Sequence, residues 1–130
     1  SYTMSGGQWG SWNAVFGVKG QDGHPAPLWD PKTGKIDHDV AKQFEKFDLR
    51  LVAERNWPTL APKLRGKIHV WVGEKDDYFL NNGVHYFDDF IGKAEPKYEG
   101  WIIYDSRGRH GWTPKPFTET MKEMIARIGK

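Results

Sequence analysis

The sequence predicts an α/β fold: a small parallel β-α-β unit with flanking helices. Two short apolar runs, "KIHVWVG" and "GWIIYD", are separated by a segment in which Val84, Phe87, Phe90 and Ile91 recur at helical spacing. Strands joined through a helix of about a dozen residues are parallel and have a right-handed crossover. We therefore expect parallel pairing of residues 67–73 with 100–105, in one domain or domain fragment of 130 residues.

The first 36 residues differ in character from the rest of the chain. Glycine and proline are frequent there and no period is sustained, so we expect an irregular segment. It contains Trp9, Trp12 and Trp29, which a disordered tail would lack, so the segment should pack against something. Residues 37–130 should form an α-β-α-β-α unit.

Two further helices are expected in that unit. Asp37 is placed to cap a helix over residues 38–55, and Pro58 and Pro62 should break it. A last helix over residues 116–128 is predicted by an apolar stripe formed by Phe117, Met121, Met124, Ile125 and Ile128.

The composition excludes several classes of protein. The 19 basic and 17 acidic residues give a net charge of +2 and are scattered, which disfavours nucleic acid as a partner. Mean hydropathy is −0.73 and no apolar window approaches a bilayer span, so we expect a soluble protein without a membrane partner. The absence of cysteine excludes disulfides and thiolate chemistry but leaves cytoplasmic and exported locations open.

Candidate site residues follow both predicted strands. Asp76 and Asp77 come directly after the first strand, and the loop "SRGRHGW" after the second contains His110. The carboxyl ends of parallel strands lie at one edge of a sheet, so Asp76 should reach a ring nitrogen of His110 by hydrogen bond or through one water. A carboxylate bonded to Nδ1–H fixes the imidazole tautomer and stabilises the imidazolium. The simpler alternative is that the aspartates are solvated helix caps.

These residues also carry a resemblance to a known family. "GQWGSWNAVFGVKGQDGHPAPLWDPKTGKID", "NWPTLAPKLRGKIHVWVGEKDDYFLNN" and "HGW" resemble the C-terminal section of bacterial esterase-like proteins of the α/β-hydrolase superfamily, from about Gln8 to Trp112. The resemblance implies that Asp76 is the triad acid, with Asp77 as second choice, and that His110 is the base. It implies acyl transfer from an ester or carbohydrate ester, with no cofactor. A metal site formed by His110 with Asp76 or Asp105 is a weaker alternative.

The nucleophile of that family has no counterpart here, because the sequence contains no G-x-S-x-G motif. We interpret Ser5, Ser11 and Ser106 as ordinary loop serines and not as the nucleophile. The resemblance therefore implies the C-terminal portion of a serine hydrolase whose nucleophile lies upstream, inactive alone. An uncovered sheet edge would make the isolated chain a homo-oligomer, most simply a two-fold dimer.

A different class of function is open as well. Trp9, Trp12 and Trp29 could form a platform that stacks on sugar rings, as in a non-catalytic carbohydrate-binding module. The simpler interpretation is that these rings anchor a core.

Overall fold

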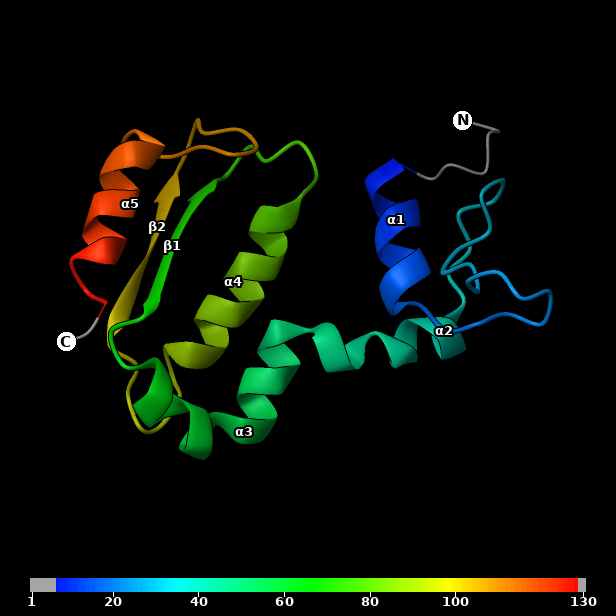
Figure 1. The fold of residues 1–130 in the computed structure, drawn as a ribbon, viewed down its shortest axis with the longest axis horizontal. Helices are drawn as coiled ribbons and strands as arrows, with labels where there is room; N and C mark the ends of the chain where they lie inside the picture. Colours follow the sequence, from blue (N-terminus) through cyan, green and yellow to red (C-terminus); the bar gives the residue numbers. More distant parts are fainter. Residues whose placement is uncertain (1–6, 129–130) are drawn as a thin grey trace. The chain divides into compact units, whose positions relative to one another are not determined.

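The structure, a computed structural model, describes residues 7–128 and is mixed α/β (Figure 1). It separates into two compact units, Ser1–Val52 and Ala53–Lys130. No helix in residues 7–128 combines the length and the apolar character that crossing a bilayer requires.

The first described element is helix α1, Gly7–Phe16, so the prediction of an irregular segment is wrong for these residues. Trp9, Trp12 and Phe16 lie three and four residues apart, which brings their rings onto one side of a helix. There the rings contact one another and the rings of Phe44 and Phe47. Mutual packing of aromatic rings thus stabilises a helix in a glycine-rich sequence.

The helix predicted over residues 38–55 is divided into α2, His38–Gln43, a 3₁₀ turn, Glu45–Phe47, and the start of α3, Leu49–Leu64. The predicted cap is confirmed, because the Asp37 carboxylate accepts the N–H groups of Asp39 and Val40 in the first turn, each at 3.0 Å. Asp48 has an extended backbone, and its carboxylate accepts the N–H of Leu51 at 3.0 Å. A second N-cap therefore starts a new helix.

Helix α3 continues through Pro58 and Pro62, where we had predicted a break. Proline removes a helical hydrogen bond, but both prolines lie on the exposed side of the helix. On the opposite side Ala53, Trp57 and Ala61 are buried, and the Trp57 indole donates to the carbonyl of Pro96 at 2.7 Å. Burial of this face compensates for the missing backbone bonds.

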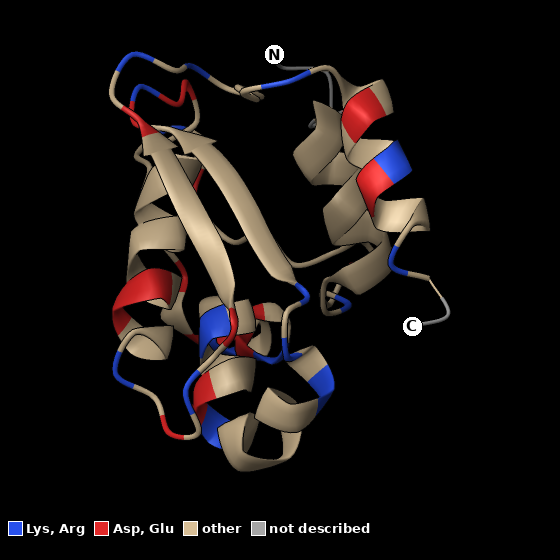
Figure 2. Cartoon of the chain, turned by 90° about the vertical axis from the view of Figure 1, so that its left-hand side faces the viewer, with Lys and Arg blue, Asp and Glu red and all other residues tan. Residues whose placement is uncertain are grey.

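The predicted β-α-β unit is confirmed. Strand β1, Ile68–Gly73, pairs in parallel with β2, Gly100–Asp105, and α4, Leu80–Ile91, connects them. Helix α5, Phe117–Ile125, lies on the other side of the sheet from α4 (Figures 1 and 2). Side chains alternate between these two faces along each strand.

The core of the second unit lies between α3, α4 and one face of the sheet. Its centre is Ile91, which is fully buried. The partly buried side chains around that centre come from both helices, both strands and the segment before β2: Leu64, Ile68, Phe87, Phe90, Tyr98 and Ile102. This core fixes α4 against the sheet and so positions the loop that follows β1.

Candidate active site

The loops after β1 and β2 are joined through their backbones. The N–H of Glu74 donates to the carbonyl of Asp105, and the N–H of Lys75 donates to the carbonyl of Gly108, both at 2.9 Å. A Cβ on Gly73 would lie 2.2 Å from the carbonyl oxygen of Gly108. The close approach therefore requires glycine at position 73, and it holds the two loops side by side.

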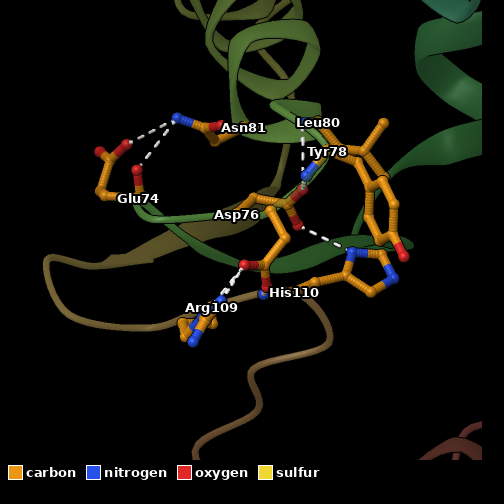
Figure 3. Close-up of polar contacts among 8 residues, drawn as sticks. Glu74, Asp76, Tyr78, Leu80, Asn81, Arg109 and His110 are labelled. Atoms are coloured by element: carbon orange, nitrogen blue, oxygen red, sulfur yellow. Dashed lines mark hydrogen bonds and ion pairs between the residues drawn. The ribbon is translucent and has the colours of Figure 1, made fainter.

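Asp76 and His110 meet where these loops join (Figure 3). Oδ2 of Asp76 lies 2.9 Å from Nδ1 of His110, which confirms the predicted contact. An ionised carboxylate only accepts hydrogen bonds, so Nδ1 is the donor. The Asp76 side chain is 5% exposed, whereas that of His110 is 48% exposed. The acid is therefore enclosed while the imidazole faces solvent.

The second oxygen of Asp76 is also satisfied. Oδ1 accepts the backbone N–H of Tyr78 at 2.9 Å and that of Leu80 at 3.3 Å, at the start of α4. Burial opposes ionisation, but the hydrogen bonds from His110, Tyr78 and Leu80 outweigh it and hold the pKa of Asp76 below its ordinary value. Asp76 is thus a fixed anion at neutral pH.

Asp77 has a different set of partners. Its Oδ1 accepts from Nε of Arg109 at 3.1 Å and from a second guanidinium nitrogen, and its Oδ2 accepts the backbone N–H of His110 at 3.4 Å. The hydrogen bond from Arg109 lowers the pKa of Asp77. This carboxylate therefore holds the backbone of the histidine loop and does not bond to the ring.

Two aromatic residues that we did not predict as site residues lie beside the pair. The Tyr78 ring meets the His110 ring edge to face, with centroids 4.7 Å apart. Phe79 has a left-handed backbone with φ of 59°, and its side chain is largely exposed. Their position between Asp77 and a helical pattern, in "DDYF", is the sequence feature that could have identified them.

A second carboxylate–imidazole pair also escaped the sequence analysis. Oε2 of Glu74 lies 2.9 Å from Nε2 of His85, and the Asn81 amide donates to the same oxygen at 3.4 Å. The His85 ring stacks on Tyr104, whose hydroxyl donates to Asp88 at 3.0 Å. The bond from His85 lowers the pKa of Glu74, whereas burial and the bond to Asp88 raise the pKa of Tyr104.

No serine within residues 7–128 forms a hydrogen bond with His110. Ser5 lies outside the described residues. The Ser11 hydroxyl donates to the carbonyl of Gly7 within α1, and Ser106 is exposed in the turn after β2.

The three candidate platform tryptophans pack together. The Trp9 ring lies 5.0 Å from that of Trp12 and 5.1 Å from that of Trp29, with interplanar angles of 27° and 38°. Trp9 and Trp12 are half-buried in the aromatic cluster. Trp29 is 39% exposed and lines an open hollow of about 500 Å³ together with Pro27, Asp30, Ile36 and His38.

The geometry of the Asp76–His110 pair is suited to moving a proton. Nδ1 of His110 is occupied by the anion, and no described residue bonds to Nε2, so Nε2 can accept a proton from a group that approaches from solvent. No three histidine or carboxylate side chains within residues 7–128 converge as a metal site requires. The chain matches no family model, no curated protein and no solved structure.

Proposed function

We propose that this chain supplies the acid and the histidine of an esterase-like serine hydrolase. One observation carries the proposal: a buried, anionic Asp76 bonded to Nδ1 of an exposed His110, at the carboxyl edge of a parallel sheet. That edge is where open α/β folds gather their catalytic groups. The resemblance to the C-terminal section of α/β-hydrolases supports the same assignment.

In the proposed reaction, a serine hydroxyl attacks the carbonyl carbon of a carboxylic ester, and Nε2 of His110 takes the hydroxyl proton. The imidazolium that forms is stabilised by Asp76, which stays ionised. His110 then returns the proton to the leaving alcohol as the tetrahedral adduct collapses to an acyl-enzyme. Water completes the cycle by the same proton transfers, so the reaction needs no cofactor. The substrate class is a small ester or a carbohydrate ester.

The attacking serine is not among the described partners of His110, so we also propose that the pair is inactive until such a serine is brought to Nε2. Each of the two strands has only one pairing partner within residues 7–128. Unpaired strand edges favour association. We therefore expect the isolated chain to form a two-fold dimer, which light scattering would detect as a doubled molar mass at high concentration.

Hydrolysis of p-nitrophenyl esters tests the proposal, with the protein expressed from its complete reading frame. His110→Ala should lower kcat/KM by about 10²–10⁴-fold, the usual contribution of general acid–base catalysis. The matched control is His85→Ala, which removes the imidazole of the second pair and should change kcat/KM less than threefold. Equal rates for the parent protein and His110→Ala would refute the proposal.

The same assay can identify the nucleophile. A fluorophosphonate probe should label one serine, and its replacement by alanine should abolish labelling. If Ser5→Ala abolishes labelling and turnover, the attacking residue lies in the present chain and its interpretation as an ordinary loop serine is wrong. Ser11→Ala and Ser106→Ala should leave the activity unchanged.

A carbohydrate-binding role is the second candidate, favoured by the hollow beside Trp29. The partly exposed indole and the nearby Asp30 and His38 offer a stacking face and polar groups. Titration with soluble glycans should then quench tryptophan fluorescence saturably, and Trp29→Ala should abolish the effect. A flat titration would exclude this role.

A further inference from the structure

A second hollow lies between the sheet and α5, on the face opposite α4. It has a volume of about 160 Å³. Strands β1 and β2 contribute His69, Trp71 and Trp101, and α5 with the turn that follows it contributes Glu123, Met124 and Arg127. None of these residues belongs to the Asp76–His110 pair, so the hollow is a separate feature of the molecule.

The floor of the hollow is aromatic. The rings of His69 and Trp101 are stacked with centroids 4.6 Å apart and an interplanar angle of 3°. The Trp71 ring lies 5.1 Å from that of Trp101 and is tilted by 35°. Strand pairing fixes the positions, because His69 is the register partner of Trp101. The three rings form a stacked row that borders the hollow, and a planar ligand can contact this row through ring edges.

Cations surround this floor. The Arg127 guanidinium lies 3.1 Å and 3.2 Å from the ring nitrogens of His69. Lys67 lines the hollow, and the Lys115 ammonium lies 5.1 Å from the centroid of the Trp71 ring. One carboxylate, that of Glu123, is present, and it is bound by Lys115.

Within residues 7–128, Arg127 forms no direct ion pair with a carboxylate, and its interaction with Glu123 is only through space. Burial and the neighbouring Arg127 lower the pKa of His69, which keeps the imidazole neutral and able to accept a hydrogen bond. Arginine prefers a planar, bidentate anion such as a carboxylate over a single imidazole. An anion in the hollow would meet that preference.

We infer that this hollow binds a small aromatic carboxylate, whose ring lies against Trp71 and Trp101 and whose carboxylate pairs with Arg127. The size limits the ligand, because pockets for drug-sized molecules measure about 300–1,000 Å³ and this one is about 160 Å³. A single ring with one carboxylate is the class that fits. The inference goes beyond the proposed hydrolase function and does not depend on it.

Titration of the chain with benzoate, followed by the indole N–H signals in ¹H–¹⁵N NMR spectra, tests the inference. The signals of Trp71 and Trp101, assigned with Trp71→Phe and Trp101→Phe, should shift saturably while the remaining indole signals stay in place. Benzamide is the neutral control of the same shape, and it should bind at least tenfold more weakly because it lacks the charge.

A variant of Arg127 and a non-aromatic ligand test separately how the charge and the aromatic ring contribute to binding. Arg127→Gln should weaken benzoate binding about tenfold or more, whereas Arg107→Gln, the same change at an exposed loop position, should not affect it. Cyclohexanecarboxylate tests the aromatic contact and should bind more weakly than benzoate, because it has no aromatic ring. Absence of saturable shifts, equal binding of benzamide, or unchanged binding by Arg127→Gln would each overturn the inference.

Discussion

The second unit contains two carboxylate–imidazole pairs with the same 2.9 Å separation, Asp76–His110 and Glu74–His85. Their surroundings differ. The Asp76 side chain is 5% exposed, and its second oxygen accepts backbone N–H groups. The Glu74 side chain is 32% exposed, and the oxygen that bonds to His85 also accepts the Asn81 amide. A short distance alone therefore does not identify a catalytic pair.

The two imidazoles differ as much as the acids do. His110 bonds to the acid through Nδ1, so its Nε2 points away from the acid. The His110 and Tyr78 rings are perpendicular to each other. His85 bonds through Nε2 and lies flat on Tyr104 at 4.5 Å. In both arrangements the carboxylate fixes the tautomer, and the imidazoles are similarly exposed, 48% for His110 and 45% for His85. The two pairs differ in the burial of the acid, in the ring nitrogen that bonds to it and in the stacking of His85 on Tyr104.

The largest difference should appear when each acid is neutralised. Asp76→Asn should lower kcat/KM for ester hydrolysis by about 10²–10⁴-fold, because the amide cannot stabilise the imidazolium. Glu74→Gln should change it less than threefold. In NMR spectra, the downfield Nδ1–H signal of His110 should disappear in Asp76→Asn and persist in Glu74→Gln. Similar losses of kcat/KM in both variants would show that the two pairs do not differ in function.

Moving one loop should break one pair and leave the other. In Gly73→Ala the new Cβ would meet the carbonyls of Gly108 and Arg109 at 2.2 Å and 2.7 Å, so the histidine loop must shift. Overpacking of this kind costs about 1–3 kcal/mol. The His110 Nδ1–H signal should be lost while the ring signals of His85 stay in place. Thermal unfolding gives the stability change, and an unaltered His110 signal would contradict the expected shift of the loop.

A smaller effect is expected at Asp77. Its bonds to Arg109 are exposed, and exposed ion pairs contribute little, so Asp77→Asn should lower kcat/KM at most about fivefold. In about 1 M salt, where charges are screened within about 3 Å, the parent protein and the variant should converge. A loss as large as that of Asp76→Asn would instead make Asp77 the functional acid.

The smallest effect concerns acid stability. The pKa values of Asp76 and Glu74 are both lowered in the folded state. A lowered folded pKa gives stability that is present above the unfolded value and lost as the pH falls. The loss should begin near the ordinary values of about 3.9 for Asp and 4.3 for Glu and continue below them.

Thermal unfolding followed by circular dichroism from pH 7 to about pH 2 measures this loss. Asp76→Asn should flatten the fall in Tm more than Glu74→Gln, because Asp76 is buried and accepts three hydrogen bonds. An equal change in the pH dependence of Tm in both variants would show that burial of the acid does not affect acid stability.

The predictable parts of the fold are those in which one local sequence pattern determines the secondary structure. Alternation in "KIHVWVG" and the apolar run "GWIIYD" predicted β1 and β2, and the helical spacing between them predicted their parallel pairing. Asp37 was recognisable as a cap from its position before a periodic segment. The Asp76–His110 contact followed from topology, since both residues come just after paired strands.

The parts that were missed depend on packing. Helix α1 contains glycines, but the spacing of Trp9, Trp12 and Phe16 was a usable signal. Helix α3 continues through two prolines because the buried face that includes Ala53 and Trp57 matters more than the local cost. The Glu74–His85 pair joins a strand end to a helix turn, and only the placement of α4 on the sheet brings these side chains together.

Phe79 shows how selection for folding and selection for activity could diverge at one position. Its left-handed backbone favours glycine or asparagine, and its largely exposed ring adds little to the core. A mutational library selected only for stability should therefore enrich small residues at position 79. A library selected for ester turnover should keep an aromatic residue if that ring touches the substrate. The residue frequencies recovered from the two libraries would show which requirement has kept a phenylalanine there.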